Sequence, residues 1–143
     1  MKIKKLEHLA KIFQEYDAFI IDLWGVMHNG IKLNDQAMNA VKQLDANQKR
    51  VVFLSNAPRP TKDVVKFLKK MNMEDRFLKN ILTSGEAAMN SLKKNKFGEK
   101  FYHLGPERDD SLFSFFKKNK TSLEKCDFIL CTGLFDEEEE NLQ

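Results

Sequence analysis

Polar residues that could do chemistry lie at or near the ends of two apolar runs, and such runs form buried strands. Asp22 lies in the run Ala18–Leu23, and Ser55 and Asn56 follow the run Val51–Leu54. A carboxylate at the end of a buried strand is poorly solvated and can act as a nucleophile or a metal ligand. A hydroxyl followed by loop amides suits an oxyanion such as phosphate. For Asp22 the alternative stays open that it is a polar strand end bonding loop amides.

The segment after Asp22 could shield this chemistry from water. Its Asn29-Gly30 pair is typical of a tight hairpin turn, which predicts a small flap. His28 lies in the same segment, and by itself we expect it to be a solvent-exposed loop residue rather than a general base.

Two further positions could bind an anion. Arg59 could add a fork of donors, although the prolines on both sides of it also indicate a simple rigid loop. Ser84 and Gly85 open a predicted helix, whose start suits an anion or is explained by capping alone.

These residues depend on strands and helices that alternate along the chain. Strands are short apolar runs, and helices show apolar residues at helical spacing. We expect strands at Ala18–Leu23, Val51–Leu54, Ile81–Thr83, Phe101–Leu104 and Phe128–Cys131. We expect one helix over residues 6–13 before the first strand, and helices over residues 36–47, 61–68, 84–95 and 110–118 between the strands. The alternation predicts an α/β protein with a mainly parallel sheet flanked by helices, in which ligands bind beyond the carboxyl ends of the strands.

Composition excludes several classes of protein. The 143 residues carry 24 basic and 21 acidic side chains, a net charge of +3, and no apolar run approaches the ~20 residues of a membrane span. We expect no nucleic acid and no membrane as partners, and we interpret Lys93, Lys94 and Lys96 as a solvated helix end. Cys126 and Cys131 match no redox or zinc spacing. They predict reduced thiols in a cytoplasmic protein.

Five motifs in order resemble the haloacid dehalogenase (HAD) superfamily, class IIA, which includes NagD-like and nitrophenylphosphatase-like members. They are DLWGVMHNG from Asp22, LSNAPRP from Leu54, TSGEAA from Thr83, YHLGPERD from Tyr102 and FILCTGLFD from Phe128. More narrowly, they resemble one hypothetical subfamily of this class with a DxWG motif.

The resemblance implies a Rossmann-like core with an inserted α/β cap, and phosphatase-type hydrolase chemistry on a phosphorylated small molecule. Asp22 would be the nucleophile, and its carboxylate and the Trp24 carbonyl would bind Mg²⁺. Ser55 and Asn56 would hold the transferring phosphoryl group. Residues 1–97 would be the N-terminal part of the core, and residues 98–143 the beginning of the cap.

The sequence departs from the family pattern in two ways. The phosphatase pattern has a second Asp two residues after the nucleophile as general acid and base, and Trp24 stands there instead. The later core motifs, a Lys and an acidic group, have no candidates in these residues. We therefore expect an N-terminal part of such a hydrolase with weak or no activity alone. Two alternatives are an enzyme completed by a second chain that supplies the missing half of the core, and a non-catalytic interaction module.

Overall fold

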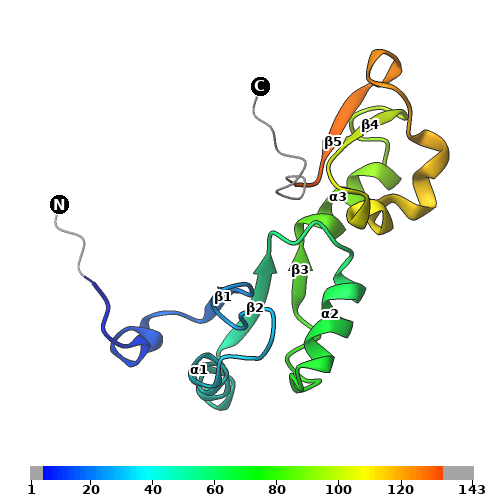
Figure 1. The fold of residues 1–143 in the computed structure, drawn as a ribbon. Coiled ribbons are helices and arrows are strands. Elements are labelled where there is room, and N and C mark those ends of the chain that lie inside the picture. Colours follow the sequence, from blue (N-terminus) through cyan, green and yellow to red (C-terminus); the bar gives the residue numbers. More distant parts are fainter. Residues whose placement is uncertain (1–4, 134–143) are drawn as a thin grey trace. The chain divides into compact units, whose positions relative to one another are not determined.

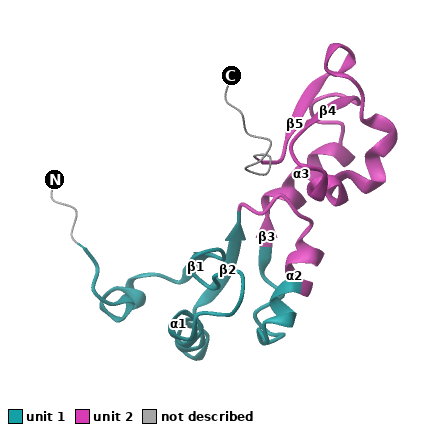
Figure 2. Ribbon diagram, in the orientation of Figure 1, with its two compact units in different colours: residues 1–55, 67–81 teal, residues 56–66, 82–143 magenta. Residues whose placement is uncertain are grey.

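A computed structural model describes residues 5–133 of the chain (Figure 1). The chain divides into two compact units. Residues 1–55 and 67–81 form unit 1, and residues 56–66 and 82–143 form unit 2 (Figure 2). The predicted division into core 1–97 and cap 98–143 stays a prediction. No helix within residues 5–133 is both long and apolar enough to cross a membrane.

A three-stranded sheet lies next to the candidate site. Its strand order is β1 (Ala18–Asp22), β2 (Arg50–Ser55) and β3 (Ile81–Thr83), so β1 is an edge strand of this sheet. β1 and β2 are parallel, and Asp22 lies opposite Leu54. The predicted parallel arrangement is therefore confirmed for this pair.

Helices follow β1, β2 and β3 in the chain. α1 (Asp35–Ala46) begins after Asn34, whose side chain accepts the N–H groups of Gln36 and Ala37. α2 (Thr61–Lys70) follows β2, and α3 (Ser84–Lys93) follows β3 directly. The buried apolar residues of unit 1 come from β2, β3, the helices α1 and α2, and the loops: Leu23, Met27, Met38, Val41, Leu44, Val51, Phe53, Leu68, Met73, Phe77, Leu78 and Ile81.

One face of this sheet is covered and the other is open. On β2 the side chains alternate between exposed and buried, beginning with exposed Arg50 and ending with buried Ser55. Ile20 is 73% exposed, and Val52 and Leu54 are also exposed. Because partners in register point to the same side of a sheet, these three side chains share one face. We call Ile20, Val52 and Leu54 the open sheet face.

Unit 2 contains a second, smaller parallel sheet. β4 (Phe101–Leu104) pairs with β5 (Phe128–Cys131), with Phe101 opposite Phe128. Its core joins α3 to the segment after β4 through Met89, Leu92, Phe101, Leu112 and Phe113. Cys126 and Cys131 are free thiols.

All five predicted strands form, but two predicted helices are of a different kind. Residues 6–13 yield two short 3₁₀ helices, η1 (Leu9–Lys11) and η2 (Phe13–Glu15), and neither has a buried residue. A short helix that fully buries none of its residues is marginal in water, which explains why the stripe of apolar residues does not become an α-helix. Residues 110–118 lie in η3 (Glu107–Asn119), a 3₁₀ segment kinked at Phe113 and Phe116, and η4 (Leu123–Lys125) follows. The acidic run at residues 136–140 lies outside the described residues.

Candidate active site

The fold brings Asp22 and Ser55 to the same end of two neighbouring strands. Asp22 is the last residue of β1, and Ser55, the last residue of β2, follows the residue that pairs with Asp22. Asp22 is exposed, whereas Ser55 is 7% exposed. Since both strands are parallel, this is the carboxyl end of the sheet, where α/β proteins bind ligands.

The Asp22 carboxylate is held by the loop that follows it. Its Oδ1 accepts the Leu23 N–H at 2.8 Å. This is the bond expected if Asp22 is a polar strand end that bonds loop amides. The bond occupies only one oxygen of the carboxylate. The other oxygen has no hydrogen-bond partner among the described residues and remains available for chemistry.

The predicted flap is present as residues 23–33. Its backbone folds back through the Gly25 N–H, which donates to the His28 carbonyl at 2.8 Å, and the Met27 N–H, which donates to the Leu23 carbonyl at 2.8 Å. The Asn29 side chain accepts the N–H groups of Ile31 and Lys32, both at 3.0 Å, and this bond pattern fixes the tight turn. The chain reverses between His28 and Leu33, which form an antiparallel bridge.

His28 is buried, so the expectation of a solvent-exposed loop residue was wrong. Its ring lies between Trp24 and Phe67, with both ring centroids at 5.5 Å and both contacts edge-to-face. Its Nδ1 accepts the Gly30 N–H at 3.1 Å. Burial lowers the pKa of His28 below its ordinary value, and the nearby charge of Asp22 partly opposes this shift.

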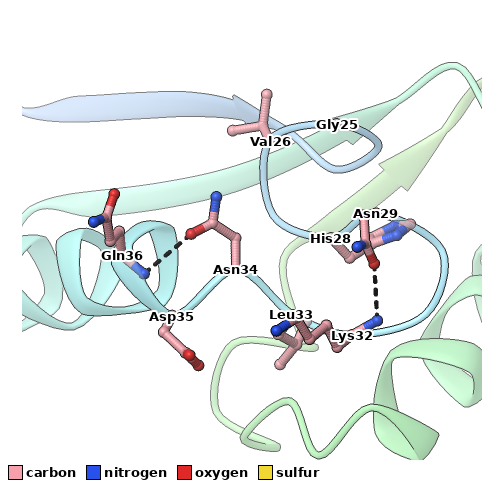
Figure 3. Close-up of a pocket in the computed structure, with 9 residues that line it drawn as sticks. All are labelled: Gly25, Val26, His28, Asn29, Lys32, Leu33, Asn34, Asp35 and Gln36. Atoms are coloured by element: carbon pink, nitrogen blue, oxygen red, sulfur yellow. Dashed lines mark hydrogen bonds between the residues drawn. The ribbon is translucent and has the colours of Figure 1, made fainter.

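A hollow of about 330 Å³ lies on the α1 side of the flap (Figure 3). Flap residues Gly25, Val26, His28, Asn29, Lys32 and Leu33 line it, together with the three residues Asn34, Asp35 and Gln36 at the start of α1. Its size is at the lower limit for a small-molecule site. Asp22 is not among the lining residues.

The loop after Ser55 is fastened to the start of α3 within unit 2. The Ser84 hydroxyl donates to the carbonyl oxygens of Asn56 and Ala57 at 2.9 and 3.0 Å. The Thr83 hydroxyl donates to the Arg59 carbonyl at 2.7 Å, and its oxygen also accepts the Glu86 N–H and caps α3. The sequence left open whether this helix start binds an anion or is simply capped. The structure shows that it is capped, by Thr83. The fastening of the loop was not predicted.

Asp22 and Trp24 offer two oxygen groups that could bind a divalent cation. The Asp22 carboxylate and the Trp24 carbonyl are hard oxygen ligands of the kind that Mg²⁺ prefers. The Trp24 carbonyl accepts no hydrogen bond from the described residues, which leaves it available. However, no three His, Cys, Asp or Glu side chains within residues 5–133 are grouped so that they could hold a metal ion. The two ligands fit in kind but do not complete a site.

This fold and site define a class of protein, namely α/β proteins with a carboxylate at the end of the first strand and a hydroxyl at the end of the next. Within it, the chain belongs to the haloacid dehalogenase-like hydrolase family, whose model matches residues 19–115. The resemblance noted in the sequence is thereby confirmed. No curated protein matches the chain.

Solved structures of the same fold include three informative relatives. A haloacid dehalogenase-like hydrolase from Brucella suis is 26% identical, with a TM-score of 0.77, over 95% of this chain and 51% of that one. A 4-nitrophenylphosphatase from Thermotoga maritima is 24% identical, with a TM-score of 0.63, over 84% and 46%. A glycerol phosphate phosphatase from Mycobacterium tuberculosis, in complex with magnesium, is 20% identical, with a TM-score of 0.58, over 85% and 37%. The chain spans about half the length of the first two and less of the third.

Proposed function

We propose that this chain carries the nucleophile half of a phosphatase-type hydrolase site centred on Asp22. The observation that carries the proposal is the placement of Asp22 and Ser55 at the ends of adjacent parallel strands in a member of this family. The substrate class is a phosphorylated small molecule. The two phosphatases among the similar structures support this class, although their likeness to this chain shows only the fold.

Each residue has a defined role in this proposal. A carboxylate oxygen of Asp22 attacks phosphorus, the bond to the leaving group breaks, and an aspartyl-phosphate forms. Ser55 and the loop at Asn56 hold the transferring phosphoryl group. Mg²⁺, held by the Asp22 carboxylate and the Trp24 carbonyl, would offset the repulsion between the carboxylate and the phosphate. Water then releases inorganic phosphate and restores Asp22.

We further propose that these 143 residues have weak or no hydrolase activity alone. Two observations support this. The indole of Trp24 cannot transfer a proton, and loss of general acid–base help typically costs about 10²–10⁴-fold in rate. The described residues also supply too few ligands for a stable Mg²⁺ site.

The test is release of 4-nitrophenolate from 4-nitrophenyl phosphate with Mg²⁺ by the purified chain. We expect a rate near that of buffer, and any excess should vanish in Asp22→Asn. Asp17→Asn is the matched control, because Asp17 is exposed and precedes the same strand. Rapid turnover that depends on Asp22 would show that the residues present are sufficient.

A second proposal is that another chain completes the site. The open sheet face and the unpaired edge of β1 favour it, because exposed apolar side chains on a sheet are usually covered by a partner. Such a chain would supply a Lys and paired acidic residues. Mixing with that chain should restore hydrolysis. A cooperative thermal transition of a soluble monomer, measured by calorimetry and light scattering, would contradict a need for completion.

The proposed location is the cytoplasm. The two free thiols, Cys126 and Cys131, support a reducing compartment.

A further inference from the structure

Asn29, in the flap, is the only asparagine of the chain that is followed by glycine. Its side chain is exposed, and its Oδ1 accepts the N–H groups of Ile31 and Lys32, both at 3.0 Å (Figure 3 draws the bond to Lys32). Two donors at one carbonyl oxygen stabilise negative charge that develops there when a nucleophile attacks the carbon. The Asn29 Cγ is therefore prepared for attack.

The nearest nucleophile along the chain is the Gly30 nitrogen, and a bond from it to the Asn29 Cγ closes a succinimide ring. Residue 30 has no side chain to crowd this nitrogen, and its φ is +90°. The Gly30 N–H donates to His28 Nδ1 at 3.1 Å. An acceptor at this hydrogen polarises the N–H group and places more electron density on the nitrogen. The bond uses a lone pair of the neutral ring and needs no change of charge on His28.

Asn34, at the other side of the same hollow, lacks this nucleophile. It is also exposed, and its Oδ1 also accepts two backbone N–H groups, from Gln36 at 3.1 Å and from Ala37 at 3.3 Å (Figure 3 draws the bond to Gln36). However, the next residue is Asp35, whose side chain crowds the nitrogen that would attack. The two asparagines thus share the donors and differ in the residue that follows.

We propose that Asn29 is a self-modification site, where the carboxamide becomes a carboxylate with water as the only co-reactant. The Gly30 nitrogen bonds to the Asn29 Cγ, the bond from Cγ to Nδ2 breaks, and the Gly30 proton passes through water to the departing ammonia. Water then opens the succinimide ring. Addition at Cγ gives aspartate, and addition at the backbone carbonyl carbon gives isoaspartate. This chemistry does not depend on the role of Asp22.

Both products change the flap. Asn29 lines the hollow beside α1, so aspartate adds a carboxylate to its wall. Isoaspartate also lengthens the backbone by one carbon between His28 and Leu33, whose antiparallel bridge marks the chain reversal. We expect the isoaspartyl form to lose the turn that the Asn29 side chain fixes.

The test is incubation of the whole chain at neutral pH and physiological temperature, followed by trypsin digestion and peptide mass spectrometry. Cleavage after Lys32 places Asn29 and Asn34 on different peptides, and electron-transfer fragmentation distinguishes isoaspartate from aspartate. We expect Asn29 to be modified at least about 5-fold faster than Asn34, and at least about 5-fold faster than in a synthetic peptide of residues 26–33, the effect of one hydrogen bond that strengthens in the transition state.

His28→Phe tests the bond at the Gly30 N–H. Phe keeps an aromatic ring between Trp24 and Phe67 but offers no acceptor. Modification of Asn29 should therefore slow by about 3- to 10-fold.

His8→Phe is the matched control, because the Nδ1 of this exposed residue also accepts the N–H two residues later, from Ala10 at 3.1 Å. It should leave the rate unchanged. A rate at Asn29 that is no greater in the folded chain than in the peptide, or no greater than at Asn34, overturns the proposal and needs no variant. A rate in His28→Phe equal to that of the unmodified chain overturns the role of the His28 bond.

Discussion

Asp22 and Trp24 are both exposed, and each is held in place by neighbouring residues of the flap. One oxygen of Asp22 is fixed by the Leu23 N–H, which orients the carboxylate without enclosing it. Trp24 has its ring supported by Gly30 and His28 but largely exposed. At this scale the glycines of the flap matter as much as the reactive residue, because they decide where the indole lies.

The first prediction compares two flap glycines with a positive φ. Gly25 has φ +78° and nothing within 4 Å of an added Cβ, whereas Gly30 has φ +90° and the Trp24 ring at 2.8 Å. We expect Gly25→Ala to lower the free energy of unfolding by about 1 kcal/mol, the cost of the left-handed backbone. Gly30→Ala should cost about 2–3 kcal/mol, because the ring must also move.

Urea unfolding measures both costs, and tryptophan emission measures the movement of the ring. Only Gly30→Ala should shift the emission of the folded protein. Equal shifts in the two variants would show that Gly30 does not support the ring.

The second prediction concerns pH. Burial lowers the pKa of His28 and of His103, and the Lys120 charge lowers that of His103 further, against the opposing charges of Asp110 and Asp109. The unfolded chain therefore takes up protons below a pH of about 6.5 while the folded chain resists them. Stability is fully present above that pH and is lost progressively as the pH falls.

Urea midpoints measured between about pH 7.5 and about 5.5 check this expectation. The fall in stability should be smaller in His28→Gln than in the unmodified chain. His8→Gln is the control, because His8 is exposed. The stability of this variant should fall with pH as much as that of the unmodified chain. A fall in His28→Gln as large as in the unmodified chain would refute the contribution of His28.

At the scale of elements, the start of α3 sets the path of the loop that follows β2. Ser84 and Thr83 donate to three carbonyl oxygens of residues 56–59, and the Gly85 N–H donates to the Ala57 carbonyl at 3.1 Å. Pro58 and Pro60 restrict the same loop. The loop that would receive a phosphate is thus rigid by composition and by its contacts.

The third prediction tests this fastening. Ser84→Ala should lower the free energy of unfolding by about 1 kcal/mol, because the Asn56 carbonyl loses the Ser84 hydroxyl as a donor and the Ala57 carbonyl keeps the Gly85 N–H. Ser91→Ala is the control within the same helix. Its hydroxyl bonds only the exposed carbonyl one turn earlier, and the change should stay within about 0.5 kcal/mol. Equal losses in urea unfolding would argue against a special role for Ser84.

Gly85→Ala should have a larger effect than either serine change. A Cβ at this position would lie 2.5 Å from the Arg59 backbone N and O, so the loop itself must move. We expect a loss of about 2–3 kcal/mol or more, as for overpacking of a core. Backbone amide NMR shifts should change across residues 56–60, and unchanged shifts would contradict the close contact.

At the scale of the whole molecule, the open sheet face is unusual because its apolar side chains are exposed to solvent. Ile20, Val52 and Leu54 are apolar and exposed, whereas Val51 and Phe53, on the opposite face of β2, are buried. The same strand thus supplies a matched pair of valines for the fourth prediction. Val52→Thr should change the stability of the chain by less than about 0.5 kcal/mol, and Val51→Thr should cost about 1–3 kcal/mol for burying a hydroxyl.

Denaturant unfolding measures the pair, first for the chain alone. If a second chain covers the open sheet face, Val52→Thr should weaken the complex while leaving the chain alone unaffected. A complex that forms with undiminished affinity would place the partner elsewhere.

Sequence reasoning succeeded where the information is local. The strands at Ala18, Val51 and Phe101 were predictable because short apolar runs bounded by polar residues leave few alternatives. The placement of Asp22 next to Ser55 followed from parallel pairing. The turn at Asn29-Gly30 followed from the residue types.

Other features depend on partners that are distant in the sequence. The burial of His28 requires Phe67, and the fastening of the loop requires Ser84, so neither residue type alone revealed them. The apolar stripe at residues 6–13 predicted a helix, yet no residue of that stripe is fully buried among the described residues. Apolar residues on both sides of β2 predicted burial on both faces, and the described residues cover only one.

The most direct test of the account is the position of the phosphoryl group after the chain is incubated with Mg²⁺ and excess 4-nitrophenyl phosphate. Peptide mass spectrometry of the acid-quenched protein locates it. The account predicts slow modification at Asp22 alone, unchanged in Asp17→Asn and absent in Asp22→Asn. A phosphoryl group on another residue, or equal modification of the Asp22→Asn variant, would contradict the assignment of Asp22 as the nucleophile.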